Sequence, residues 1–142
     1  MKVSKNVITG IEYRMPEDSD DSVGIEEFLQ KNNGKKVVVV QGLGFVGAVM
    51  SLVCANALTE EYAVIGVDLA NESTYWKIKS INDGFFPLIA DDPKIAEFFD
   101  NAKAKGNFLA TYDPVAYQYA DVIIIDINLD VQKESFEKGG LK

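Results

Sequence analysis

Residues 35–47, KKVVVVQGLGFVG, join a run of four valines to a glycine-rich turn. Four consecutive β-branched residues are typical of a parallel strand that is buried on both faces. The turn has the pattern G-x-G-x-x-G, in which Gly42 permits a tight turn, Gly44 lets the backbone approach a pyrophosphate, and Gly47 lets the next helix pack closely on the strand. The free N–H groups and the positive dipole end of that helix would face the anion. The stretch therefore predicts a dinucleotide site.

A second strand pattern, YAVIGV at 62–67, ends in Asp68. A carboxylate at this place accepts hydrogen bonds from the hydroxyls of an adenosine ribose and repels a 2′-phosphate. No arginine follows Arg14 in the chain, which also favours NAD over NADP, although Lys77 or Lys79 could take the place of an arginine. NAD is the predicted cofactor.

From residue 36 onward, strand and helix patterns alternate, which predicts an α/β fold built as a Rossmann-like, doubly wound parallel sheet. Strands are expected at 36–41, 62–68, 107–111 and 122–127. Helices are expected at 46–58, 72–82, 92–106 and 115–119. Right-handed crossovers would put the strand before Gly42 at the centre of the sheet, with the ligand crevice at its carboxyl end.

Residues 1–34 differ in composition from the rest, and we expect them to form a lead-in segment before a Rossmann-like domain at 35–142. They are polar, acidic from Glu17 to Asp21, and contain one helix pattern that begins at Asp21 or Ser22. Its apolar face consists of Ile25, Phe28 and Leu29, and Asn33-Gly34 would end it. The segment either docks on the domain or on a partner subunit, or forms a partly ordered tail without a function.

Composition excludes several classes of function. With 142 residues, a formal net charge of −8 and no cluster of basic residues, the chain is not expected to bind nucleic acid. It has no apolar run long enough for a membrane span and no apolar signal peptide, so we expect a cytoplasmic protein. Without histidine and with a single cysteine, a metal site or a disulfide is not expected. Cys54 lies in the apolar helix pattern and is predicted to be a small buried hydrophobe.

Two further stretches carry polar groups. Asp126, Asn128 and Asp130 alternate with Ile127 and Leu129 where the fourth strand ends. Two carboxylates there could pair for acid/base work, but acids at a strand exit are usually solvated, and we favour that interpretation. The stretch NDGFFP at 82–87 predicts a helix stop, with Phe85 or Phe86 covering the core.

Four stretches have patterns that occur together in one family. GLGFVG at 42–47 is similar to G-x-G-[YF]-V-G, and IGVD at 65–68 is similar to a strand that ends in a cofactor-binding acid. KI at 77–78 with INDGFFPL at 81–88 is similar to K-V-x-x-[LI]-N-x-G-x-x-P-[IL]. LATYD at 109–113 with ADVIII at 120–125 is similar to [LF]-x-x-T-x-D…A-D-V-I-[IF]-[IV]. Over about residues 36–127, the chain thus resembles the N-terminal, NAD-binding domain of the UDP-glucose/GDP-mannose dehydrogenase family of nucleotide-sugar dehydrogenases.

The resemblance implies a parent enzyme that oxidises the C6 alcohol of a UDP- or GDP-sugar to the uronate, with NAD as the oxidant. The residues that it assigns to the cofactor are Gly42, Gly44, Phe45, Val46, Gly47, Asp68 and Lys77. The family's catalytic cysteine and lysine match no position here, and Cys54 is not their counterpart. The chain therefore resembles a truncated enzyme, a cofactor half without its substrate half, and is expected to have no catalytic residue and no activity alone. A nucleotide sugar would be the partner of the parent enzyme, which could form a homo-oligomer.

Two departures from the family pattern stand out. The interval from Asp68 to Lys77 is about four residues longer than expected, so the loop beside the adenosine is predicted to be remodelled. The V-P-T-P that follows the fourth strand in the family is replaced here by INLD at 127–130, which puts Leu129 where the family has a threonine.

Two other functions remain open. One is a non-catalytic nucleotide-binding or partner-docking Rossmann module. The other is a methyltransferase that binds S-adenosylmethionine, which the glycine spacing and Gln41 before the turn disfavour.

Overall fold

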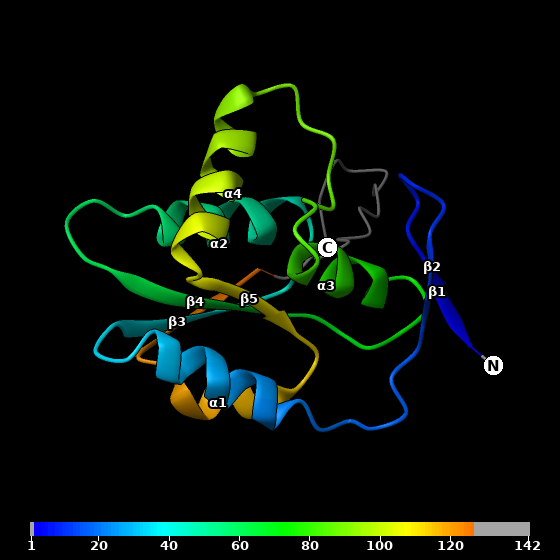
Figure 1. The fold of residues 1–142 in the computed structure, drawn as a ribbon, viewed down its shortest axis with the longest axis horizontal. Coiled ribbons are helices and arrows are strands. Elements are labelled where there is room, and N and C mark those ends of the chain that lie inside the picture. The colour runs from blue at the N-terminus through cyan, green and yellow to red at the C-terminus, as the bar shows by residue number, and fades with distance from the viewer. Residues whose placement is uncertain (1, 127–142) are drawn as a thin grey trace, which may run out of the picture.

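The structure is a computed structural model in which residues 2–126 are described (Figure 1). Its elements in chain order are β1 (Val3–Lys5), β2 (Glu12–Arg14), α1 (Ser22–Lys31), β3 (Lys36–Gln41), α2 (Phe45–Ala55), β4 (Tyr62–Val67), α3 (Tyr75–Asn82), α4 (Pro93–Lys105), β5 (Phe108–Thr111), the 3₁₀ helix η1 (Pro114–Tyr119) and β6 (Val122–Ile125). The strand and helix order from residue 36 onward agrees with the sequence prediction, and the bounds differ by a few residues.

The main sheet has four parallel strands in the order β5-β4-β3-β6. Strand β3 is internal, and Val39 pairs with Ile65 on one side and with Ile123 on the other. All four valines of β3 are buried, as expected for a strand covered on both faces. This confirms the predicted α/β, Rossmann-like fold and the internal position of the strand before Gly42.

Helices cover both faces of the sheet. In Figure 1, α2, α3 and α4 lie on one face, and α1 and η1 lie on the other. Each face has its own hydrophobic core, one centred on Val38, Val40 and Leu52 and the other on Ile25, Val39 and Ile65. Phe86 packs against Phe99 in the first core, whereas Phe85 is mostly exposed. The prediction that one of the two phenylalanines covers the core is therefore confirmed for Phe86.

Two helix starts have the capping chemistry that the sequence indicates. Asp92 accepts a hydrogen bond from the Lys94 amide before α4, and Asp113 accepts one from the Val115 amide before η1. A proline follows each of these caps, at a position where its missing N–H costs nothing. Helix α4 ends at Gly106, whose φ of 67° is left-handed.

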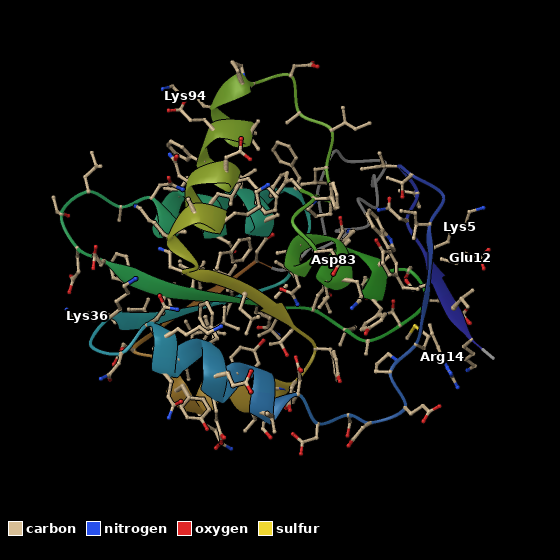
Figure 2. All side chains as sticks on the ribbon, viewed as in Figure 1. Lys5, Glu12, Arg14, Lys36, Asp83 and Lys94 are labelled. Atoms are coloured by element: carbon tan, nitrogen blue, oxygen red, sulfur yellow. The ribbon has the colours of Figure 1, made fainter. Side chains whose placement is uncertain are left out.

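The six charged side chains labelled in Figure 2 are all exposed. Lys36 pairs with Glu60 at 3.2 Å, and Lys94 pairs with Glu97 at 3.5 Å, in both cases with exposed side chains. Exposed pairs of this kind contribute little to stability. The fold is held by its two cores.

The N-terminal segment packs on the domain at both faces. Helix α1 buries Ile25 and Phe28 in the core that η1 also lines, on the face where the connection from β5 to β6 supplies only a 3₁₀ helix. The hairpin β1-β2 lies against α3, where the buried Ser4 hydroxyl donates to the Glu72 carbonyl and accepts from the Trp76 amide. The sequence does not predict this hairpin, because three-residue strands are too short to show a clear alternation.

Asp21 joins the start of α1 to the end of β5. Its carboxylate accepts from the Thr111 hydroxyl at 2.6 Å, and its amide donates to Asp113 at 2.7 Å. Burial is the main cause that raises the pKa of Asp21, and the charges of Asp113 and Asp20 add to it. In contrast, the pKa of Asp20 is lowered by its hydrogen bonds with Ser22.

We expect Asp21→Asn to stabilise the domain relative to the wild type at neutral pH. The folded-state pKa lies above the ordinary value of 3.8, so ionisation of Asp21 costs stability as the pH rises from below 3.8 through the raised pKa. The advantage of the variant should grow over that window and then level off. Urea unfolding at a series of pH values measures it.

Asp20→Asn is the matched control, because the lowered pKa of Asp20 means that its ionised form stabilises the fold. This variant should lose stability relative to the wild type as the pH rises. A pH-independent difference between Asp21→Asn and the wild type would contradict the assignment.

Candidate functional site

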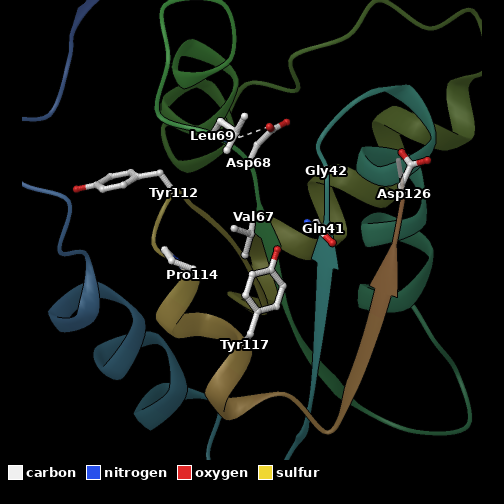
Figure 3. Close-up of a pocket in the computed structure, with 9 residues that line it drawn as sticks. All are labelled: Gln41, Gly42, Val67, Asp68, Leu69, Tyr112, Pro114, Tyr117 and Asp126. Atoms are coloured by element: carbon white, nitrogen blue, oxygen red, sulfur yellow. Dashed lines mark hydrogen bonds between the residues drawn. The ribbon is translucent and has the colours of Figure 1, made fainter. Parts of the chain in front are cut away.

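The candidate site lies at the carboxyl edge of the sheet, where β3, β4 and β6 end side by side. Two pockets meet there and share Gly42, Asp68 and Asp126, and Figure 3 shows the lining of one of them. One, of about 500 Å³, extends toward the loop between β5 and η1, and we name it the loop pocket. The other, of about 410 Å³, lies in front of the first turn of α2, and we name it the helix pocket. Both volumes are in the range of small-molecule sites.

The three glycines of the turn are required for different reasons. Gly42 has a φ of +98°, and a Cβ there would lie 2.4 Å from the Asp126 carbonyl oxygen. At Gly47, a Cβ would lie 2.0 Å from the Gly42 carbonyl oxygen. At Gly44, a Cβ would meet nothing within 4 Å, and its φ of −68° suits any residue. The fold therefore requires Gly42 and Gly47, whereas Gly44 leaves open space in front of the helix.

That open space faces the N-terminus of α2, with Gly44 as the residue before the helix. The first hydrogen bond inside the helix runs from the Ala48 amide to the Gly44 carbonyl. Within residues 2–126, the amides of Phe45 and Val46 have no hydrogen-bond acceptor. Free amides at a helix N-terminus form a site for an anion. The side chains of both residues are exposed.

Asp68 follows β4 and lies beside the turn. One carboxylate oxygen accepts from the Leu43 amide at 2.9 Å, and the other accepts from the Leu69 amide at 2.7 Å. The bond to Leu43 ties the end of β4 to the glycine turn, so Asp68 has a structural role that its place in the sequence does not indicate. A carboxylate has about four acceptor positions, so two remain for a ligand hydroxyl.

Lys77 and Thr74 line the helix pocket from the side of α3. Lys77 is half-buried, and its ammonium lies 5.9 Å from the centre of the Trp76 ring. The loop between Asp68 and α3 is held by Asn71, whose side chain accepts from the amides of Ser73 and Thr74. The hairpin supports the same loop through the bond from Ser4 to Glu72.

The loop pocket has a largely apolar wall made of Val67, Pro114 and Tyr117. The Tyr117 ring stands below the carboxyl ends of β3 and β4, and Tyr112 points toward the N-terminal segment, where it donates to the Asp18 carbonyl (Figure 3). Burial raises the pKa of Tyr117, and the charge of Asp68 adds to this. Tyr117 is therefore a neutral hydrogen-bond donor at physiological pH.

Asp126 departs from the prediction of a solvated acid at the strand exit. Its carboxylate accepts from the Gly47 amide at 2.7 Å, and it lines both pockets. That prediction was wrong for Asp126, because the end of β6 lies against the start of α2 and directs the side chain onto a helix amide. Asn128 and Asp130, the other two residues of that prediction, lie outside the described residues, as does Leu129.

Six of the seven residues that the sequence assigns to the cofactor meet at one pocket. Gly42, Gly44, Phe45, Val46, Asp68 and Lys77 all line the helix pocket. Gly47 lies behind it, packed on Gly42 and Asp126. The arrangement joins free helix amides, one cation and two carboxylates at the end of a central parallel strand, where open α/β sheets bind nucleotides.

Cys54 is half-buried on α2 and packs against the first core. Burial raises the pKa of its thiol, which disfavours the nucleophilic thiolate. Over residues 2–126, no cluster of three or more side chains has the arrangement of a metal site. No helix in the same range is both long and apolar enough to cross a membrane.

Two comparisons with known proteins found similar proteins. Residues 35–137 match the family model of the UDP-glucose/GDP-mannose dehydrogenase family, NAD binding domain. Among solved structures, the chain is similar to the NDP-N-acetyl-D-galactosaminuronic acid dehydrogenase from Methanosarcina mazei Go1, with a TM-score of 0.60 and 26% identity over 73% of this chain. The match spans 22% of that dehydrogenase, about a fifth of its length. No match was found among curated proteins.

The glycines allow a paired test of fold against binding. We expect Gly44→Val to fold, with a loss of no more than about 1 kcal/mol for a poorer residue before the helix, and to bind no NAD, because the side chain fills the open space. Gly47→Ala should instead lose about 1–3 kcal/mol or more in the free energy of unfolding, since its Cβ meets backbone.

Urea unfolding and calorimetric titration of both variants with NAD measure the two effects. Normal NAD binding by a folded Gly44→Val variant would contradict the placement of the ligand at the turn.

Proposed function

Because the chain belongs to the UDP-glucose/GDP-mannose dehydrogenase family through its NAD-binding domain, we propose that it is the cofactor-binding part of a nucleotide-sugar dehydrogenase. The parent enzyme would oxidise the C6 alcohol of a UDP- or GDP-sugar to the uronate. The observation that carries the proposal is the open space at Gly44 in front of the amides of Phe45 and Val46, because no group among residues 2–126 fills that space or accepts from those amides.

NAD is the cofactor of this domain family, and the site suits its parts. The pyrophosphate would bind at the amides of Phe45 and Val46, with Lys77 as the cation in the lining of the same pocket. The adenosine ribose would bind to Asp68, which keeps free acceptor positions beside its two backbone bonds. The adenine would occupy the loop pocket, against Val67, Pro114 and Tyr117.

The bound cofactor supplies a hydride acceptor, and the described residues bind and orient it. We propose that residues 35–142 form the cofactor-binding domain and that residues 1–34 are an N-terminal segment that completes one face of its sheet. A non-catalytic nucleotide-binding module is the alternative. The two differ in whether a substrate domain with a catalytic cysteine and lysine accompanies this chain in the cell.

We expect the chain to bind NAD more tightly than NADP, by at least about tenfold, because the carboxylate of Asp68 would face the 2′-phosphate of NADP. Asp68→Asn keeps an acceptor for one backbone amide but removes the charge, so the preference should shrink.

Calorimetric titration of both cofactors with the wild type and the variant measures this, and thermal unfolding checks that the turn stays intact. NADP binding as tight as NAD binding by the wild type would refute the role given to Asp68.

The chain alone should reduce no NAD in the presence of UDP-glucose, UDP-N-acetylmannosamine or GDP-mannose. Its described residues include a site for the cofactor, but the one thiol, Cys54, is packed on the core with a raised pKa and away from the turn. Absorbance of NADH during incubation with each sugar measures turnover. Turnover that disappears in Cys54→Ser would make Cys54 catalytic, contrary to this proposal.

A further inference from the structure

In the helix pocket, the carboxylate of Asp126 lies at the N-terminus of α2, where an anionic ligand would be expected to bind. The Gly47 amide belongs to the first turn of α2, and the Asp126 carboxylate accepts from it at 2.7 Å. A carboxylate at this place satisfies a helix amide and compensates the positive end of the helix dipole. Without this carboxylate, a phosphate could accept from the same amide and interact with the same end of the dipole.

The charges around the pocket add to this effect. Asp126 and Asp68 both line the helix pocket, and Lys77 is the only cation among the described residues of its lining. A pyrophosphate bound at the amides of Phe45 and Val46 would therefore share the pocket with two carboxylates. The pocket is partly buried, so charges there are screened less than in water. Repulsion by Asp126 opposes the binding that the rest of the turn favours.

The side chain of Asp126 can rotate away from the Gly47 amide of α2 while its backbone stays in place. Its backbone is fixed, because its amide donates to the Gln41 carbonyl and its own carbonyl oxygen lies against Gly42. Its side chain is half-buried, and within residues 2–126 the Gly47 amide is the one hydrogen-bond partner of the carboxylate. Rotation about the side-chain bonds would free this amide without moving the strand.

We propose that Asp126 is an internal competitor of the cofactor: its carboxylate binds the Gly47 amide at the N-terminus of α2 in the free protein and opposes the binding of a pyrophosphate at the neighbouring amides of Phe45 and Val46. This inference rests on the proposed function, since it takes the turn to be the pyrophosphate site. It makes Asp126 the residue that limits the affinity for NAD. The proposal also means that Asp126 opposes only the pyrophosphate of the cofactor. The adenosine binds beside Asp68 and is not affected by Asp126.

Removal of the charge tests the proposal. Asp126→Asn keeps an oxygen for the Gly47 amide, and Asp126→Ala frees that amide. Both should bind NAD and ADP-ribose about tenfold or more tightly than the wild type, as expected for loss of one nearby like charge. The gain should shrink as salt is added. Binding of adenosine, which has no phosphate, should be unchanged.

Asp121→Asn is the matched control. Asp121 stands at the other end of β6 and accepts from the Val37 amide at 2.8 Å, so it makes the same kind of carboxylate-to-amide bond far from both pockets. This variant should bind NAD as the wild type does. Thermal unfolding of all three variants shows whether each remains folded.

The outcomes separate the two proposals. The competitor role is supported if the Asp126 variants bind NAD more tightly than the wild type, or if the variants bind NAD and the wild type does not. Wild-type binding of NAD with equal or weaker binding by folded Asp126 variants overturns it and leaves the proposed function standing. If neither the wild type nor any folded variant binds NAD or ADP-ribose, both proposals fail. An equal gain in Asp121→Asn would reduce the effect to net charge and also overturn the proposal.

Discussion

The backbone of the glycine turn packs so closely on its surroundings that two of its three glycines leave no room for a side chain. Gly47 lies on the carbonyl of Gly42, and Gly42 lies on the carbonyl of Asp126, so the turn, the start of α2 and the end of β6 are fixed against one another. Asp68 adds the end of β4 to this group through the Leu43 amide. These close contacts fix the relative positions of the turn, Asp68 and Asp126 at the carboxyl edge.

The sheet needs cover on both faces, and the chain provides it in two ways. On one face, the crossover helices α2, α3 and α4 come from the alternation of strands and helices itself. On the other, the crossover between β5 and β6 is a 3₁₀ helix of six residues, too short to cover the sheet alone. Helix α1 of the N-terminal segment supplies Ile25 and Phe28 to that face. A segment that lies before the region matched by the family model thus forms part of the core.

Much of the fold could be predicted from the sequence because the signals are local. Four valines, the glycine spacing, and the caps Asp92 and Asp113 each depend on neighbouring residues, and each predicted element is present within a few residues. The pocket residues could also be predicted, because strand ends at one edge of a parallel sheet bring their loops together.

The parts that the sequence missed depend on contacts between distant residues. The hairpin β1-β2 has strands of three residues, and Ser4 binds groups on α3 and the loop before it. Asp126 looked like an ordinary solvated acid, because only the packing of β6 beside α2 brings its carboxylate to the Gly47 amide. Asp68 was predicted to serve a ligand, but its two bonds to the backbone emerge only once β4 and the turn lie side by side.

The N-terminal segment also affects the order in which the molecule can assemble during synthesis. Helix α1 and Asp21 leave the ribosome early, but their partners on β5 and η1 follow about ninety residues later, as the bond from Thr111 to Asp21 illustrates. Contacts between such distant residues form late, because the chain between them must first be ordered. The core that receives Ile25 and Phe28 is therefore completed only after β5 and η1 have been synthesised.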